Sequence, residues 1–136
     1  MKNIFLLILF PFLLNAQTSP ELAKDSIKTK NNPTIGRSKE EAKQLIESYR
    51  QRILNGENFS VLAALYSEDP GSAKQGGQLP PFGRGKMVPE FEEVAFSLKP
   101  GEISDVFQTQ YGFHFIQLLA REGDKVMARH ILISAK

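Results

Sequence analysis

Helix-forming patterns come first in this chain of 136 residues, and strand-forming patterns come last. Across residues 39–54, apolar side chains recur at spacings of three and four, which is the stripe of an amphipathic helix. Ser38 and Glu41 form an S-x-x-E capping box ahead of it, and Gly56 is suited to ending it. The stripe consists of Ala42, Leu45, Ile46, Tyr49 and Ile53. We therefore predict a helix over 39–54 that packs against another element.

Further helices and a set of strands are predicted downstream. Residues 59–66 fit a shorter helix, and Pro89 is suited to the first turn of a third. The inward side chains would be Phe59, Leu62, Ala63 and Tyr66 in one, and Phe91, Val94 and Ala95 in the other. Turn residues then separate the segments DVFQT, FHFIQLLA and KVMARHILI, which are rich in β-branched and aromatic residues. This order predicts an α+β domain with helices packed against an antiparallel sheet.

Composition excludes several classes of site. The chain has no cysteine, so it can form neither a disulfide nor a thiolate metal site, and its stability must come from a packed core. Its 17 basic residues nearly balance its 15 acidic ones, and no basic cluster with interleaved aromatic residues occurs. We expect no nucleic-acid partner, no metal site and no cofactor.

The N-terminal residues are typical of an export signal. Residues 1–16 carry Lys2, then an apolar run that Pro11 interrupts, and they end on a small residue. The alternative is an uncleaved membrane anchor, but the run is short for the ~30 Å of a bilayer core. We predict a cleaved signal peptide over 1–16, a flexible polar leader over 17–37 and a folded domain over 38–136. The mature protein would be periplasmic or secreted, without a stable membrane anchor.

Five motifs occur between residues 38 and 118: F-x-x-L-A-x-x-Y-S, G-G-x-L, F-x-R-G-x-M-V-P-x-F-E, K-P-G-E-I-S and T-x-x-G-F-H. This stretch resembles the parvulin-type (PpiC-like) peptidyl-prolyl cis–trans isomerases. The resemblance implies an FKBP-like superfold in which helices pack on a four-stranded antiparallel sheet. It also implies isomerisation of Xaa–Pro bonds during the folding of exported or envelope proteins. The substrates would be unfolded or extended proline-containing polypeptides, and no cofactor would be needed.

The resemblance also implies four catalytic residues. His114 and His130 match the histidine pair beneath the substrate amide in the family. Asp69 falls where members carry cysteine or aspartate, and Thr109 matches a hydroxyl of the same network. The structural alternatives are a histidine pair that maintains the sheet, a turn-forming aspartate before proline and an ordinary strand threonine. Glu68 is an alternative to Asp69, because an insertion beside them leaves the alignment uncertain by one residue.

Four apolar residues are implied to bind substrate. Met87 and Phe91 would hold the proline ring, Leu79 would form a wall, and Phe82 belongs to the same loop motif. Periodicity alone would assign Phe91 to the core instead.

One departure from the family pattern affects the loop beside this pocket. The usual G-G-D-L-G-x-F appears as G-G-Q-L-P-P-F over residues 76–82. Pro80 and Pro81 each remove a backbone donor, and Gln78 removes a charge. The alternative function is therefore a non-catalytic periplasmic chaperone or peptide-binding module that uses the same groove.

The histidine-bearing strand occupies an unusual place in the chain. Parvulins begin with a strand bearing H-I-L-V or a similar run, whereas here R-H-I-L-I occurs at residues 129–133. It could complete this domain as a circularly permuted strand, exchange with a partner chain, or be the remnant of a following domain. We favour the permuted strand, because residues 121–123 suit a hairpin loop that pairs Ala120 with Asp124. His114 would then face His130 directly, with both rings on the same side of the sheet.

Overall fold

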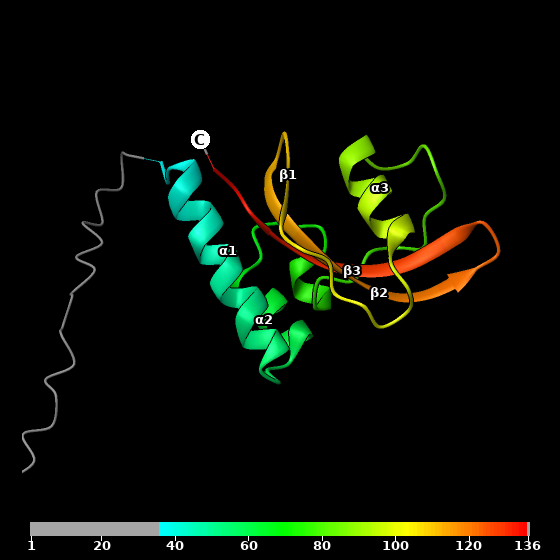
Figure 1. Ribbon diagram of the computed structural model, residues 1–136, viewed down its shortest axis with the longest axis horizontal. Coiled ribbons are helices and arrows are strands. Elements are labelled where there is room, and N and C mark those ends of the chain that lie inside the picture. The colour runs from blue at the N-terminus through cyan, green and yellow to red at the C-terminus, as the bar shows by residue number, and fades with distance from the viewer. Residues whose placement is uncertain (1–35, 136) are drawn as a thin grey trace, which may run out of the picture. The chain divides into compact units, whose positions relative to one another are not determined.

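The computed structural model describes residues 36–135, so the predicted signal peptide and most of the predicted leader lie outside the described residues. The helices are α1 (Lys39–Leu54), α2 (Phe59–Tyr66), a 3-10 turn (Ala73–Gln75) and α3 (Pro89–Ser97). The strands are β1 (Phe107–Thr109), β2 (Gly112–Glu122) and β3 (Lys125–Ile133), as Figure 1 shows. The predicted α+β order and antiparallel sheet are confirmed. None of the helices in residues 36–135 has the length and apolar character needed to span a membrane.

The first two helices cover one face of the sheet. The predicted capping box forms at the start of α1, where the Glu41 amide donates to Ser38 Oγ and the Ser38 amide donates to the Glu41 carboxylate. Asn58 caps α2 through a single bond, in which its side-chain oxygen accepts from the Val61 amide. The buried cluster beneath them includes Ile46, Phe59, Leu62, Phe113, Phe115, Ile131 and Ile133. The caps and the spacing of the apolar residues thus determine where α1 and α2 form, and burial of their apolar faces holds them against the sheet.

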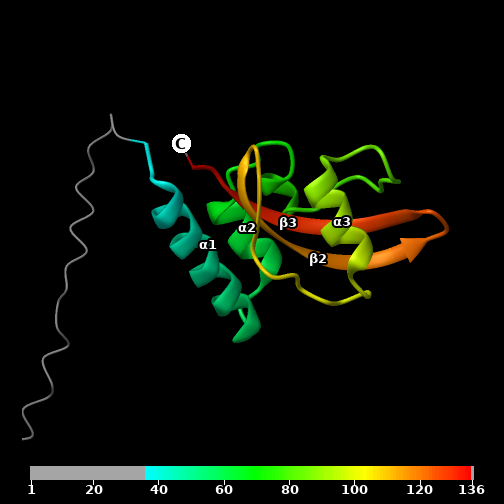
Figure 2. The same ribbon diagram turned by 45° about the horizontal axis from the view of Figure 1, so that its top comes forward.

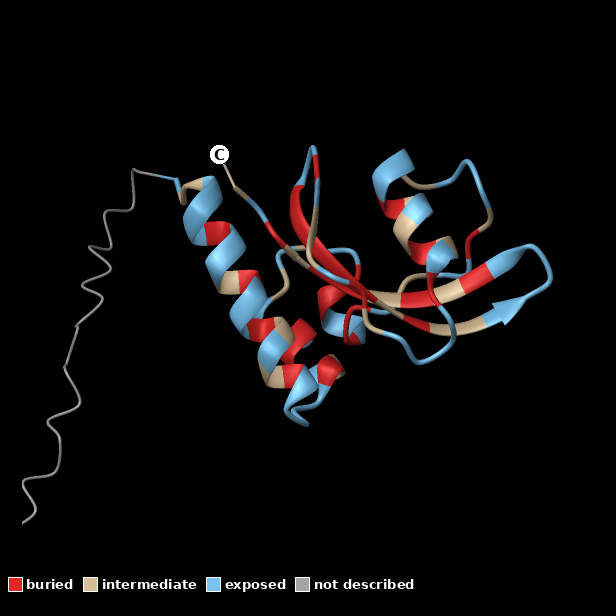
Figure 3. Ribbon diagram, in the orientation of Figure 1, coloured by how far each residue is buried: buried red, intermediate tan, exposed pale blue. Residues whose placement is uncertain are grey.

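The third helix covers the other face, and Figure 2 shows α3 lying across β2 and β3. A second buried cluster joins it to the strands through Phe82, Phe91, Ala95, Leu98, Ile116, Leu118, Val126 and Ala128. Because side chains alternate along a strand, His114 and His130 lie on this α3 side with Ile116 and Ala128. Both faces of the β2–β3 hairpin are therefore buried along most of its length, whereas the end beside its turn is exposed (Figure 3).

The prediction of four strands is not confirmed: in residues 36–135 the sheet has three, in the order β1-β2-β3. Residues 77–82 follow the outer edge of β3, yet they form only isolated bridges, at Gln78 and Phe82. Pro80 and Pro81 lie between these bridges and have no N–H, so a continuous ladder cannot form. The loop nevertheless covers the edge that β3 would otherwise expose.

The C-terminal strand pairs with β2 of the same chain, but the predicted register is wrong. Glu122 pairs with Lys125, which leaves a two-residue turn instead of the predicted three-residue loop. The register then shifts between Leu118 and Ala120, as expected for a β-bulge. As a result His114 faces Leu132 rather than His130. The offset from the prediction is two residues, an even number, so both histidines stay on the same face.

Candidate active site

A continuous polar chain connects the four predicted catalytic residues. His130 Nε2 lies 2.7 Å from Asp69 Oδ2, and His130 Nδ1 lies 3.4 Å from His114 Nδ1. His114 Nε2 lies 2.7 Å from Thr109 Oγ1. The four side chains come from the loop after α2, from β3, from β2 and from β1, so the fold brings together residues 61 positions apart in the sequence.

Burial determines the charge of the two histidines. They are only 4% and 5% exposed. Burial, helped by the neighbouring His130, lowers the pKa of His114 to about 4. Burial also lowers the pKa of His130, although its hydrogen bond to Asp69 opposes the change. Both rings are therefore neutral at pH 7.

With both rings neutral and Asp69 ionised, the donors and acceptors along this polar chain of side chains can be arranged in one way. His130 donates from Nε2 to Asp69, so its Nδ1 must accept. His114 then donates from Nδ1 to His130, and its Nε2 accepts from the Thr109 hydroxyl. Each of the three hydrogen bonds in this polar chain then has one donor and one acceptor.

Asp69 is held on its other side by the turn that follows it. The Ser72 hydroxyl donates to Asp69 Oδ2 at 2.6 Å, and the Gly71 amide donates to Oδ1 at 3.1 Å. Partial burial opposes ionisation of this carboxyl, but hydrogen bonds from Ser72, His130 and Gly71 together lower its pKa. Glu68, the alternative left open by the sequence, instead binds Arg37 and Ser134. Asp69 is thus the carboxylate that contacts the histidine pair.

An apolar cleft of about 570 Å³ opens above the histidines. Phe91 forms its floor and meets His114 and His130 nearly edge-on, with ring centroids 5.6 Å and 5.2 Å apart. The cleft is lined by Glu68, Asp69, Pro70, Leu79, Lys86, Met87, Val88, Phe91, Tyr111, His114, His130, Leu132 and Ser134. The predicted residues Leu79, Met87 and Phe91 therefore share one cavity with the polar chain.

Two predicted site residues lie behind the cleft rather than on its wall. Phe82 is 4% exposed and packs against Phe91, with ring centroids 6.1 Å apart. It supports the floor of the cleft instead of lining it. Thr109 is likewise buried, and it contacts His114 on the side away from His130.

Most of the chain also matches a known protein family. The model of the PPIC-type PPIASE domain matches residues 15–122, which is more than half of the chain. The chain belongs to this family. The match ends before β3 begins, so the strand that carries His130 lies outside it.

Relatives within the PPIC-type family match this chain over a part of their own length. Foldase protein PrsA of Geobacillus kaustophilus is 53% identical over 76 residues, or 56% of this chain and 27% of that protein. Chaperone SurA of Nitrosococcus oceani is 45% identical over 89 residues, or 65% of this chain and 21% of that protein. A crystal structure of the peptidylprolyl isomerase PrsA from Bacillus cereus is similar with a TM-score of 0.55 and 38% identity, covering 63% of this chain and 32% of that one. The chain thus spans about a quarter of the length of these curated relatives.

Sequence reasoning missed several residues of this PPIC-type site. Ser72 is fully buried against Asp69, and the D-x-x-S spacing within a Pro-Gly turn was the available signal. Tyr111 and Lys86 line the cleft from inside two of the family motifs, T-x-x-G-F-H and F-x-R-G-x-M. Within residues 36–135, no group of three or more His, Cys, Asp or Glu side chains is arranged to hold a metal ion.

Proposed function

We propose that this domain is a peptidyl-prolyl cis–trans isomerase that acts on Xaa–Pro bonds of exported or envelope proteins during folding. The observation that carries the proposal is the apolar floor of Phe91 set directly against a buried, fully hydrogen-bonded histidine pair. Family membership supports the same activity. Its substrates would be unfolded or extended polypeptides that contain proline.

The reaction requires a catalyst that binds the twisted amide better than either planar form. Rotation about the Xaa–Pro bond is opposed by a barrier of ~18–20 kcal/mol, which comes from amide resonance. Resonance places negative charge on the carbonyl oxygen and positive charge on the nitrogen. A cleft that is apolar around the proline ring solvates this charge separation poorly. Leu79, Met87 and Phe91 would therefore both hold the ring and weaken the resonance that keeps the bond planar.

Asp69 would add an electrostatic contribution. Its carboxylate lines the cleft, and the low pKa of this carboxyl keeps it ionised at pH 7. A negative charge near the substrate carbonyl disfavours charge build-up on that oxygen and so favours the twisted state. The neutral histidines would orient Asp69 through the 2.7 Å contact of His130, without forming a covalent intermediate.

A refolding assay limited by proline isomerisation tests this proposal. We expect the wild-type protein to accelerate the slow phase, and Asp69→Ala and Phe91→Leu each to reduce the acceleration strongly. Leu65→Ala, which changes a 66% exposed side chain on α2, is the matched control and should leave the rate unchanged. Suppressed aggregation with no change in the slow phase would contradict the proposal and support the non-catalytic chaperone.

We further infer that β3 takes the place of the strand that precedes the first helix in the family, so that the domain is circularly permuted. The R-H-I-L-I run, the antiparallel pairing with β2 and the delivery of His130 to the site support this inference. Moving residues 124–136 ahead of residue 37 through a flexible linker should preserve folding and activity. Loss of both in a rearranged protein that is still expressed would contradict it.

We also propose that residues 1–16 direct export, that residues 17–37 serve as a leader and that residues 38–136 form the functional domain. The basic start and apolar run of residues 1–16 support the first part. Mass spectrometry of protein recovered from an exporting host should give a mature chain that begins at Gln17. A chain that retains residues 1–16 would contradict cleavage.

A further inference from the structure

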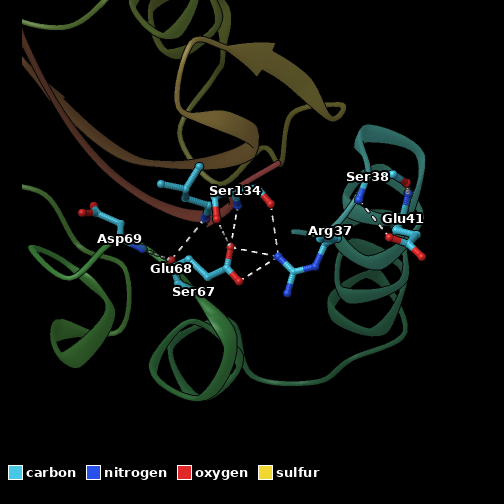
Figure 4. A network of polar contacts seen from close by, with 8 residues as sticks. Arg37, Ser38, Glu41, Ser67, Glu68, Asp69 and Ser134 are labelled. Carbon is cyan, nitrogen blue, oxygen red and sulfur yellow. Dashed lines mark hydrogen bonds and ion pairs between the residues drawn. The ribbon is translucent and has the colours of Figure 1, made fainter. Parts of the chain in front are cut away.

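A second polar network fastens the segment that carries Asp69 to the end of β3 (Figure 4). The Glu68 carboxylate accepts hydrogen bonds from the Ser134 amide and, at 2.7 Å, from the Ser134 hydroxyl. Arg37 Nη1 donates to both Glu68 oxygens, at 2.8 Å and 3.0 Å, and to the Ser134 carbonyl at 3.1 Å. We call Arg37, Glu68 and Ser134 the clamp.

Backbone contacts continue the clamp toward the histidine pair. The Glu68 amide donates to the Leu132 carbonyl at 2.7 Å, and the Leu132 amide donates to Ser67 Oγ at 3.1 Å. Leu132 is two residues after His130, and Glu68 is the residue before Asp69. The clamp therefore sets how segment 67–69 lies along the end of β3, directly beside the Asp69–His130 hydrogen bond.

Charge and exposure indicate what the clamp contributes. Partial burial opposes ionisation of Glu68, but hydrogen bonds from Ser134 and Arg37 together lower the pKa of its carboxyl. The Arg37 and Glu68 side chains are about one third exposed. Ion pairs with this much exposure add little to global stability. The clamp therefore affects the neighbouring site through the position it gives to segment 67–69, more than through its contribution to the free energy of folding.

We propose that Arg37 and Glu68 are positioning residues that hold Asp69 against His130 for the reaction proposed above. Arg37 lies at the end of the segment predicted as a leader, so this assignment gives that residue a part in the site. Without the clamp, segment 67–69 keeps its two hydrogen bonds with Leu132 but loses the bonds that fix the Glu68 side chain, so Asp69 can shift against His130. A displacement of about 1 Å in a catalytic group is enough to cost a large factor in turnover.

Steady-state kinetics on a proline peptide separate positioning from a purely structural role. For Arg37→Ala we expect kcat to fall by on the order of tenfold with KM within about twofold, because the apolar residues Leu79, Met87 and Phe91 stay in place while Asp69 moves. Arg37→Lys should restore much of kcat, because all three clamp bonds of Arg37 come from a single nitrogen and an ammonium group has three donors. Arg52→Ala is the matched control, since it removes the exposed Arg52–Glu57 ion pair at the end of α1.

NMR of the His130 ring keeps this test independent of activity. Because the Asp69 contact raises the pKa of His130 against the effect of burial, Arg37→Ala and Glu68→Gln should lower that pKa and shift the ring ¹⁵N signals. Arg52→Ala should leave both unchanged. A wild-type protein without isomerase activity would refute the proposed function, whereas the His130 signals would still report on the clamp. Wild-type kcat and unshifted His130 signals in Arg37→Ala would overturn the positioning role.

Discussion

The buried histidines make the stability of the domain depend on pH in a defined window. Burial lowers the pKa of His114 from 6.5 to about 4, so the unfolded chain binds a proton at that residue before the folded chain does. The stabilisation is fully present above pH 6.5 and is lost as the pH falls toward 4. A difference of about 2.5 pKa units, at 1.36 kcal/mol each, corresponds to roughly 3 kcal/mol for this residue. His130, whose pKa is also lowered, acts in the same direction.

Urea denaturation at half-unit steps from pH 7.5 to 4.5 measures this loss. Across most of this window carboxylates contribute little, because the unfolded pKa values of Asp and Glu lie near 4. The wild-type free energy of unfolding should fall by about 2–3 kcal/mol over these steps. His114→Gln keeps a polar side chain but removes the titration, so its slope should be clearly smaller. An equal slope in wild type and His114→Gln would refute the neutral, buried assignment of His114.

Three further predictions concern the shell of the site. Gly77 has φ of +81°, and a Cβ there would lie 2.2 Å from the His130 carbonyl oxygen. Gly77→Ala should therefore lower the free energy of unfolding by about 2 kcal/mol or more. Gly56→Ala is the control and should lower it less, because Gly56 has φ of +106° but open space around its Cβ position. Ser72→Ala removes the 2.6 Å donor to Asp69, so NMR titration should show a raised Asp69 pKa, and no change would contradict the role of Ser72. Lys86 lines the cleft, so its charge should favour peptides with Glu before proline over peptides with Lys before proline. In Lys86→Glu the ratio of the two kcat/KM values, Glu peptide to Lys peptide, should fall about two- to fivefold. An unchanged ratio would show that Lys86 does not contact the residue before proline.

Local sequence signals were sufficient for most of the secondary structure. The bounds of α1 and α2 follow from a capping box, an asparagine cap and stripes of apolar residues, all of which act within one or two helical turns. The pairing of β2 with β3 also followed from a short turn between two strand-like segments. These features depend on neighbours in the sequence, so a single sequence reveals them.

The register and the strand number depended on backbone detail that side-chain patterns do not encode. A register shift between Leu118 and Ala120 and a two-residue turn moved the predicted pairing by two positions. The four-stranded sheet was implied by the family resemblance, whereas residues 77–82, which contain Pro80 and Pro81, form only isolated bridges beside β3. Because the side-chain period of a strand is two, the histidine pair survived this error, and an odd offset would have separated the rings.

The residues of the candidate site could likewise be predicted only in part from the sequence. Motif resemblance identified the residues of the polar chain, but it could not distinguish Phe91, which faces the cleft, from Phe82, which lies behind it. Both are buried aromatic residues, so only the fold assigns their roles. The contact of Arg37 with Ser134 joins residues 97 positions apart, and no local pattern in the sequence marks it.

Exchange NMR on a short Xaa–Pro peptide tests the central claim most directly. At substoichiometric protein, the account predicts exchange cross-peaks between the cis and trans forms on a subsecond timescale, compared with tens to hundreds of seconds without catalyst. Asp69→Asn should greatly weaken these cross-peaks while binding of the peptide to the cleft, followed by shifts at Met87 and Phe91, persists. Peptide binding in this cleft with no cis–trans exchange in the wild-type protein would contradict the account.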